Sequence, residues 1–311
     1  MLRIDPRTGE KTVLADIAPG LDNCTFVGDR LFVSSISGQV NEILGPGNIQ
    51  SLVPDGLQWP LGLAIGDDGV LFVSDGGFTY TLRPGGKLQL MGMLFSPGFP
   101  GYTRGAAAAG PGEWVVTTAN GEVARYFPAR PESYVLAGGF DRLMDVAIAP
   151  DGTIVFAEYG TGRVLSVEAG EVTELARGLK EPKGVAIDTD GTCYVTESAG
   201  GRVVKLSRGK AETVLDGLQR PEGIALVGGR LYILDVKAQE LIEYDPASGA
   251  RRTLASNLPV GAPPGVVPKL LGAVGAMCGP MGNFTGIAAG ADGTIYVSGD
   301  AEGSVLAIHS V

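Results

Sequence analysis

Short apolar runs alternate with glycine-containing turns along most of the chain. Residues 181–205, EPKGVAIDTDGTCYVTESAGGRVVK, give the clearest example. Gly184 to Ile187 predicts a short strand of small residues, and Asp190-Gly191 predicts a hairpin turn, because glycine readily takes the positive φ that such a turn needs. The stretch predicts a four-stranded antiparallel sheet. Its second, third and fourth strands are expected at residues 192–196, 202–206 and 212–215.

The same pattern recurs at a spacing of roughly 40 residues, which is typical of a β-propeller with four strands in each blade. Equivalent second-strand positions are Leu31, Leu71, Trp114, Ile154, Cys193, Leu231 and Ile295. The last interval is longer by roughly 24 residues. We therefore predict an all-β fold, a seven-bladed propeller in a single domain over residues 1–311. An apolar insertion at 259–283 is expected between blades six and seven.

The two ends of the chain both carry strand patterns. Residues 2–6, LRIDP, resemble residues 241–246, LIEYDP, in the third strand of a blade, and residues 11–15 suit a fourth strand. Residues 286–310 supply first, second and third strands. We therefore expect the N- and C-terminal strands to share one blade and close the ring, which removes exposed sheet edges. The sequence does not decide which of the two third strands lies in that blade.

Composition and charge limit the classes of molecule that the protein is expected to bind. The formal net charge of −10 argues against nucleic acid and against an anionic membrane surface. The three cysteines have no metal-binding or disulfide spacing, and we interpret them as reduced thiols of a cytoplasmic protein. No apolar run is long enough to span a bilayer, and no signal peptide begins at Met1. A small-molecule partner is therefore expected, and the oligomeric state is left open.

Charged residues recur where the first strand of each repeat begins. In a propeller these positions converge at the mouth of the central channel, and a closed repeat has no structural need for charge there. We therefore take Asp22, Arg104, Asp145, Lys183 and Glu222 as candidate catalytic residues. The alternative is a set of ion pairs between neighbouring blades, such as Lys183 with Glu222. In repeat order the position holds Asp22, Leu61, Arg104, Met144, Lys183, Glu222 and Thr285, while Asn23 and Asp145 replace the glycine that follows it elsewhere.

A second set of polar residues stands at the ends of the second strands. An acid that recurs in several blades is expected to accept backbone N–H bonds in its own turn, so we interpret this set as structural. Tyr159 and Asp300 lie beside it. The set is Ser35, Asp75, Thr118, Glu158, Glu197, Asp235 and Gly299.

Aromatic residues near the same end predict the substrate class. The 259–283 insertion is mostly apolar, so it either plugs the ring, covers an apolar ligand or contacts a partner. His309 is the only histidine, which excludes a histidine-based triad or metal cluster. We expect a substrate more apolar than a sugar lactone. Its candidate binding residues are Trp59, Phe99, Tyr102, Tyr159 and Phe284.

Around residues 182–203 the chain resembles NHL-repeat propellers, and it is similar to the senescence-marker-protein/gluconolactonase and virginiamycin B lyase families. The gluconolactonase resemblance implies a six-bladed ring and one divalent cation (Ca, Mg or Zn) at the channel mouth. By its motif, Glu222-Gly223 matches one ligand and Asp22 offers a second acid. The lyase family is seven-bladed but relies on histidines that this chain lacks.

Three hypotheses for function follow. The first is a lactonase-like hydrolase, in which a metal on Asp22 and Glu222 polarises a carbonyl. The second is a metal-free lyase or isomerase, in which Lys183 or Arg104 stabilises an oxyanion while Glu222 or Asp145 moves a proton. The third is a non-catalytic interaction module that uses the apolar insertion. We favour an enzyme, and no organic cofactor is indicated.

Overall fold

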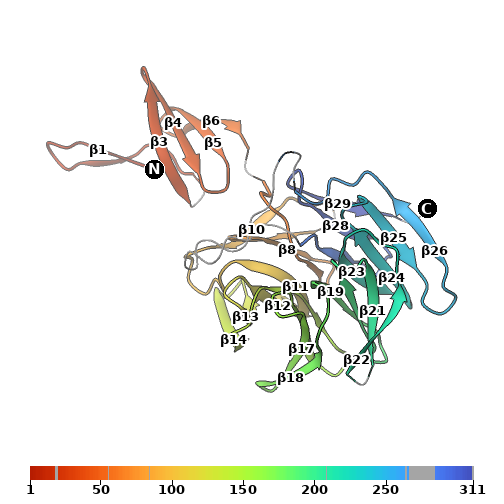
Figure 1. Ribbon diagram of the computed structural model, residues 1–311. Helices are drawn as coiled ribbons and strands as arrows, with labels where there is room; N and C mark the ends of the chain where they lie inside the picture. The colour runs from red at the N-terminus through yellow and green to blue at the C-terminus, as the bar shows by residue number, and fades with distance from the viewer. Residues whose placement is uncertain are drawn as a thin grey trace. The chain divides into compact units, whose positions relative to one another are not determined.

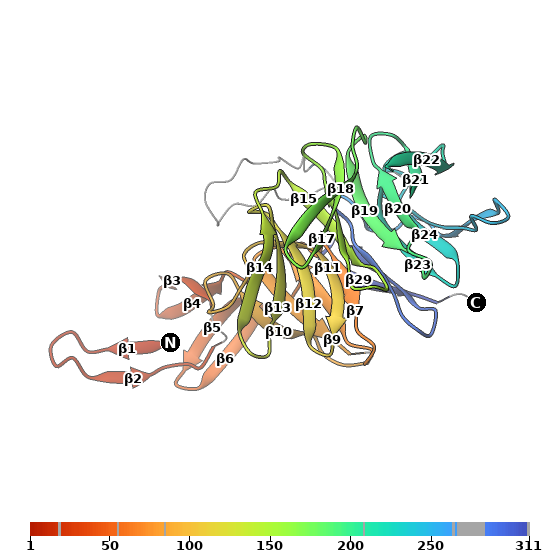
Figure 2. The ribbon, with the colours of Figure 1, turned by 90° about the horizontal axis from the view of Figure 1, so that it is seen from below.

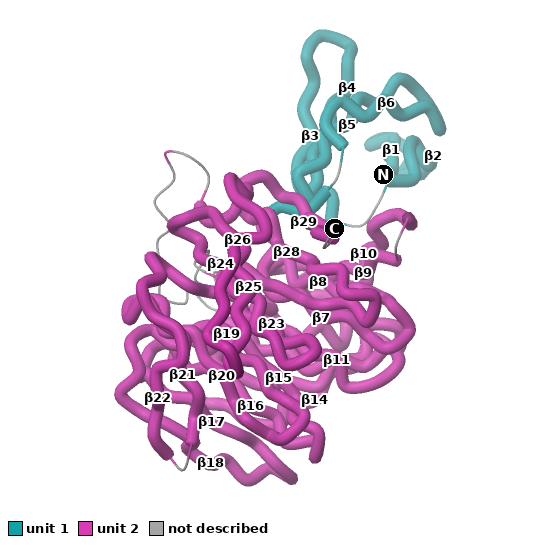
Figure 3. Tube along the Cα trace, turned by 90° about the vertical axis from the view of Figure 1, so that its right-hand side faces the viewer, with its two compact units in different colours: residues 1–58 teal, residues 59–311 magenta. Residues whose placement is uncertain are grey.

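The computed structural model describes residues 1–17, 20–54, 56–83, 85–207, 209–262, 265 and 284–309, and the regular elements in these residues are all β-strands. The chain divides into two compact units, residues 1–58 and 59–311 (Figure 3). We predicted one domain over 1–311, and that stays a prediction. In the described part no helix could cross a membrane.

Unit 1 holds a hairpin and one antiparallel sheet (Figure 1). Strand β1 (Leu2–Ile4) pairs with β2 (Lys11–Val13). The sheet is built in chain order from β3 (Leu21–Val27), β4 (Arg30–Ser35), β5 (Val40–Gly45) and β6 (Asn48–Val53). Its buried cluster is Ala15, Leu31, Val33 and Ile43, whereas β3 is exposed along its whole length.

Unit 2 holds six antiparallel sheets, each following chain order as in the β11–β14 sheet of Figure 2. The first two comprise β7 (Leu63–Ile65), β8 (Leu71–Asp75), β9 (Phe78–Leu82) and β10 (Gln89–Met93), then β11 (Thr103–Gly110), β12 (Glu113–Thr118), β13 (Glu122–Phe127) and β14 (Glu132–Gly138). The next two comprise β15 (Leu143–Ile148), β16 (Ile154–Glu158), β17 (Arg163–Glu168) and β18 (Glu171–Ala176), then β19 (Pro182–Ile187), β20 (Cys193–Glu197), β21 (Arg202–Ser207) and β22 (Lys210–Leu215). The last two comprise β23 (Pro221–Val227), β24 (Arg230–Asp235), β25 (Glu240–Tyr244) and β26 (Arg251–Ala255), then β27 (Ile287–Ala289), β28 (Ile295–Gly299) and β29 (Ser304–Ile308).

The predicted four-stranded repeat is confirmed, because every predicted second-strand position lies in the second strand of a sheet. In unit 2 each first strand contacts the first strand of the next sheet. The contacts run from β7 through β11, β15, β19 and β23 to β27, and β27 contacts β7. The N-terminal ends of these six first strands thereby lie at one end of the sheets, which we call the mouth end.

Glycine at the start of these strands allows the close approach. A Cβ at Gly62 would lie 2.1 Å from the carbonyl oxygen of Arg104, and one at Gly286 would lie 2.1 Å from that of Leu61. Real Cβ atoms do not come so near to backbone, so only glycine fits here. Second-strand hydroxyls reinforce the junctions: Thr196 Oγ1 donates to the carbonyl of Glu222 at 2.6 Å, and Ser298 Oγ to that of Leu61 at 2.5 Å.

The predicted pairing of the two chain ends is not found in the described residues. Strands β1 and β2 pair with each other, and the sheet of β27, β28 and β29 has three strands there. The turn between β1 and β2 is short and is held by Asp5, whose carboxylate accepts the N–H of Arg7 at 2.7 Å. Such a local closure costs little chain entropy. Of the two competing third strands, Ser304–Ile308 lies in the last sheet.

The predicted insertion at 259–283 lies mostly outside the described residues, which include only 259–262 and 265 of it. Its proposed roles as a plug, a lid or a partner contact therefore stay hypotheses from the sequence.

Candidate functional site

Side chains from distant parts of the sequence meet at the mouth end of unit 2. Leu61, Met144 and Phe284 belong to one buried cluster, and Trp59 and Tyr159 pack against it. We call these five residues the mouth cluster. Three of the five predicted substrate-binding residues are thus brought together in an apolar cluster, and their role in binding a substrate stays a prediction.

A buried ion pair lies beside this cluster. Lys183 Nζ on β19 is 2.7 Å from Glu222 Oε1 on β23, and both side chains are fully buried. Arg220 Nε is 3.3 Å from the same oxygen, while the Thr285 N–H donates to Glu222 Oε2 at 3.0 Å. Burial lowers the pKa of Lys183, and the charge of Glu222 opposes that shift. The ion pair between neighbouring sheets that we weighed as the alternative interpretation is therefore present.

Asp145 stands on β15 where the neighbouring first strands have glycine. Its Oδ2 accepts the N–H of Val185, on the next first strand, at 3.1 Å. Burial raises the pKa of this carboxyl to about 7, although its hydrogen bonds oppose the shift. Asp145 can therefore gain or lose a proton near neutral pH, which is what a general acid or base requires.

Asp300 is a second carboxyl of this kind, and we did not predict it as a site residue. It is 3 % exposed, and its Oδ1 accepts the N–H of Gly261 at 2.7 Å and the hydroxyl of Thr285 at 3.2 Å. Burial and the nearby charge of Glu222 raise the pKa of Asp300 to about 7. The sequence signal is an acid displaced by one position, because Gly299 occupies the place where other repeats carry one.

The raised pKa values of Asp145 and Asp300 lead to a prediction for how the stability of the protein depends on pH. Each binds its proton more tightly in the folded than in the unfolded protein, so the free energy of unfolding should fall as the pH rises from about 4 to about 7. Each group contributes a slope of at most about 1.4 kcal/mol per pH unit. Denaturant unfolding across that range measures the slope. Asp145→Asn should reduce it, whereas Asp216→Asn at an exposed position should leave it; an unchanged slope in Asp145→Asn would contradict the assignment.

Arg104 on β11 is buried, and no acidic side chain of the described residues forms an ion pair with it. The residue is 3 % exposed, and Nη1 donates to the carbonyl of Leu143 at 2.8 Å. Burial and the positive charge of Arg142 lower the pKa of Arg104 to about 10, so it stays charged at neutral pH. In the described part of the chain, Nη2 has no hydrogen-bond partner.

Further polar residues stand two positions before the candidate residues at the starts of the first strands. Arg142 is one of them, and its guanidinium lies 5.5 Å from the centroid of the aromatic ring of Tyr159. Lys183 Nζ lies 5.9 Å from the same centroid. Burial and a hydrogen bond with Glu181 raise the pKa of Tyr159. Arg142 and Glu181 both adopt positive φ, of 54° and 55°, which is uncommon for such residues. Arg142, Glu181 and Arg220 were missed, and comparing this earlier position across the repeats would have found them.

The remaining predicted residues do not belong to the mouth cluster. Asp22 lies on β3 in unit 1 and is exposed, so the site described here is built from unit 2 alone. Phe99 is not part of the mouth cluster, because it packs edge-on against Tyr126 at 6.1 Å in the cluster of Phe72 and Trp114. Tyr102 lies against the Gly76-Gly77 turn.

The acids at the ends of the second strands are structural, as expected, but their partners differ. Glu158 accepts the N–H of Asp141 at 2.8 Å, Glu197 that of Lys180 at 2.6 Å, and Asp235 those of Gln219 and Arg220 at 2.7 and 2.8 Å. These donors lie in the segments that lead into each first strand, and Asp235 accepts in addition the N–H of Ala238 in its own turn at 3.4 Å. These acids thus fix the segments that carry the mouth residues.

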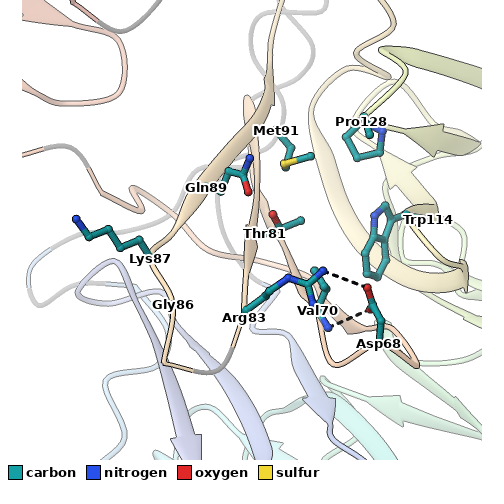
Figure 4. A pocket seen from close by; sticks show the side chains of 12 residues that line it. Asp68, Val70, Thr81, Arg83, Gly86, Lys87, Gln89, Met91, Trp114 and Pro128 are labelled. Carbon is teal, nitrogen blue, oxygen red and sulfur yellow. Dashed lines mark hydrogen bonds and ion pairs between the residues drawn. The ribbon is translucent and has the colours of Figure 1, made fainter.

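Two cavities differ in their relation to the site. One of about 290 Å³ opens at the mouth end and is lined by Glu222 and Arg220 together with Lys237 and Gly261. The other, of about 320 Å³, lies at the opposite end of its strands, where Arg83 is 3.5 Å from Asp68 beside Trp114 (Figure 4). Only the first touches a predicted site residue.

The described residues do not fit the divalent cation that the family resemblance implies. Both oxygens of Glu222 are already engaged, one by two cations and the other by a backbone N–H. The positive charges of these two side chains oppose the binding of a metal cation at Glu222. The described part of the chain contains no group of three acidic, histidine or cysteine side chains that could hold a metal. No step of the chemistry below passes through a metal.

Comparison with known proteins shows the fold. No family model matches the sequence. No curated protein matches it either. Among solved structures, virginiamycin B lyase from Staphylococcus aureus is 16 % identical over 94 % of this chain and 95 % of that chain, with a TM-score of 0.56. A putative gluconolactonase is 15 % identical over 83 % and 92 %, with a TM-score of 0.58. The calcium-binding protein regucalcin from Agrobacterium tumefaciens is 17 % identical over 78 % and 82 %, with a TM-score of 0.58.

These likenesses agree with the β-propeller fold expected from the repeats. At such identities they carry the fold and not the chemistry. The chain has the fold of the β-propeller proteins to which the lyase, the gluconolactonase and regucalcin belong.

Proposed function

We propose that the protein is an enzyme acting on a small carbonyl compound at the mouth end of unit 2, and that it transfers a proton without a metal. The observation that carries the proposal is the placement of Asp145. Its strand, β15, lies between the strands of two buried cations, Arg104 on β11 and Lys183 on β19. A carboxyl with a pKa of about 7 thus stands on the strand between those of two buried cations.

This arrangement suits lyase or isomerase chemistry. Asp145 would accept a proton from the carbon next to the carbonyl group, and the positive charge of Lys183 would stabilise the negative charge that moves onto the substrate oxygen. In an isomerase the proton returns to another carbon. In a lyase a leaving group departs from the adjacent carbon with its bonding electrons. The apolar side chains of Leu61, Met144 and Phe284 keep water away from the charge.

Lactonase-like hydrolysis is the second candidate, because a putative gluconolactonase and regucalcin share the fold. Here the same carboxyl would take the proton of an attacking water. For either activity we propose an apolar small-molecule substrate and a cytoplasmic location.

The blade count also belongs to this proposal. The contact between β27 and β7 supports a ring of six sheets in unit 2, and the seventh predicted sheet, β3–β6, lies in unit 1.

Turnover of a panel of lactones, hydroxy acids and keto acids tests the function. We expect activity that survives a chelator and rises through pH 7 as Asp145 loses its proton. Asp145→Asn should lower kcat/KM by about 100-fold or more and abolish the pH 7 limb. Asp190→Asn is the matched control, since its carboxyl lies in an exposed turn. Loss of activity on chelation, or full activity in Asp145→Asn, would refute the metal-free mechanism.

A further inference from the structure

Arg104 carries a buried positive charge for which the described residues provide no counter-charge. No carboxylate of the described residues forms an ion pair with it, and its Nη2 has no hydrogen-bond partner there. Lys183 is buried to the same degree but has Glu222 at 2.7 Å. Residues 263–283 contain no Asp or Glu, so that part of the chain cannot supply the missing carboxylate.

An unpaired buried charge is costly, and proteins normally pair it with an opposite charge or keep it hydrated. The one charged side chain that contributes to the pKa shift of Arg104 is Arg142, which is also positive. A bound anion would supply the opposite charge that the described residues do not provide. A guanidinium also presents parallel N–H groups that match the two oxygens of a carboxylate.

Other unpartnered polar atoms lie on the same two sheets. In the described structure Ser74 Oγ on β8, Thr103 Oγ1 on β11 and Trp59 Nε1 have no hydrogen-bond partner, although all are buried atoms. Elsewhere in the ring the hydroxyl equivalent to Ser74 is satisfied: those of Thr196 and Ser298 each donate to a carbonyl of the next first strand. Of the six such atoms in the described residues, these three and Arg104 Nη2 lie where β7 and β11 begin, while the other two are Arg125 Nε on β13 and Ser198 Oγ after β20.

We propose that Arg104 is the binding residue for a carboxylate group carried by the substrate. The substrate class is then a small carboxylic acid, with a charged end at Arg104 and an apolar body against Leu61, Met144 and Phe284. The identification of the anion as substrate rests on the proposed function, whereas the anion site itself does not. Arg104 thus binds a charge already present before reaction, and Lys183 faces the charge that develops.

Thermal unfolding with simple anions tests the site without any assumption about turnover. Acetate is titrated at constant ionic strength, with neutral acetamide as the matched probe. We expect acetate to raise the Tm of the wild-type protein by about 2 °C or more once it exceeds its Kd tenfold, and acetamide to leave it unchanged. Arg104→Met should show no acetate response, and without acetate its Tm should equal or exceed that of wild type, because the uncompensated charge is gone. Lys205→Met, at an exposed ion pair, should keep the response.

Contrary results are equally clear. A wild-type Tm that ignores acetate, an equal shift with acetamide, or a Tm of Arg104→Met lowered as far as that of Lys183→Met would overturn the proposal. Acetate binding without any turnover in the panel would leave the anion site standing and reject the proposed function. Turnover that depends on Asp145 but shows the same KM for acids in wild type and Arg104→Met would reject the anion site alone.

Discussion

Lys183→Met is expected to lower the free energy of unfolding by about 3–5 kcal/mol. Methionine fills a similar volume, so the loss comes from charge and not from a cavity. Glu222 would remain fully buried, with Arg220 at 3.3 Å and the Thr285 N–H as its partners. Arg220 is partly exposed, so it compensates Glu222 less well than the buried ammonium group does. Denaturant unfolding monitored by tryptophan fluorescence measures the difference.

Two further variants separate charge from packing. Lys205→Met removes a lysine of the same sheet whose partner, Glu212, lies 3.2 Å away in an exposed pair, and it should cost at most about 1 kcal/mol. Lys183→Met combined with Glu222→Met removes both buried charges and should recover part of the loss, since replacing a buried pair by apolar groups is often neutral. A single Lys183→Met variant as stable as wild type would show that the pair contributes nothing to folding.

The repeat was predictable from the sequence because each turn and strand carries its own local signal. Asp190-Gly191 marks a hairpin wherever it stands, and the alternation around Cys193 marks a buried strand. The convergence of Lys183 and Glu222 followed from the repeat itself, since equivalent positions in neighbouring sheets must meet. Whether the two residues form an ion pair was left open by the sequence, and the 2.7 Å distance between Lys183 Nζ and Glu222 Oε1 shows that they do.

Pairing between distant segments was less predictable. The likeness of residues 2–6 to a third strand is real, but it does not identify the partner strand, and β1 pairs with β2. Phe99 follows a strand end near the mouth in sequence, yet its ring packs against Tyr126 in another cluster. Asp300 was noted beside the second set of polar residues but was not predicted as a site residue, because one residue displaces it from the repeat position. In each case the deciding interaction is between side chains or strands that a local pattern does not relate.

Gly105→Ala should be among the most harmful single changes in unit 2. The added Cβ would lie 2.5 Å from the carbonyl oxygen of Met144 and 2.7 Å from the Cα of Asp145, both backbone atoms of the next first strand. A flexible side chain could move aside, but here two strands must separate. We expect the free energy of unfolding to fall by about 3 kcal/mol. The shift would also displace Arg104 and Asp145, so the acetate response should weaken.

Gly110→Ala is the matched control, because it lies on the same strand β11 and its added Cβ would meet only the Glu113 side chain, at 3.9 Å. Both changes reduce the entropy of the unfolded chain equally, which by itself stabilises the fold by about 0.4–1 kcal/mol. The difference between the two variants in urea unfolding therefore isolates the contact with β15. Equal stabilities would mean that the first strands are not packed as closely as the glycine positions require, and the convergence of Arg104, Asp145 and Lys183 would lose its structural basis.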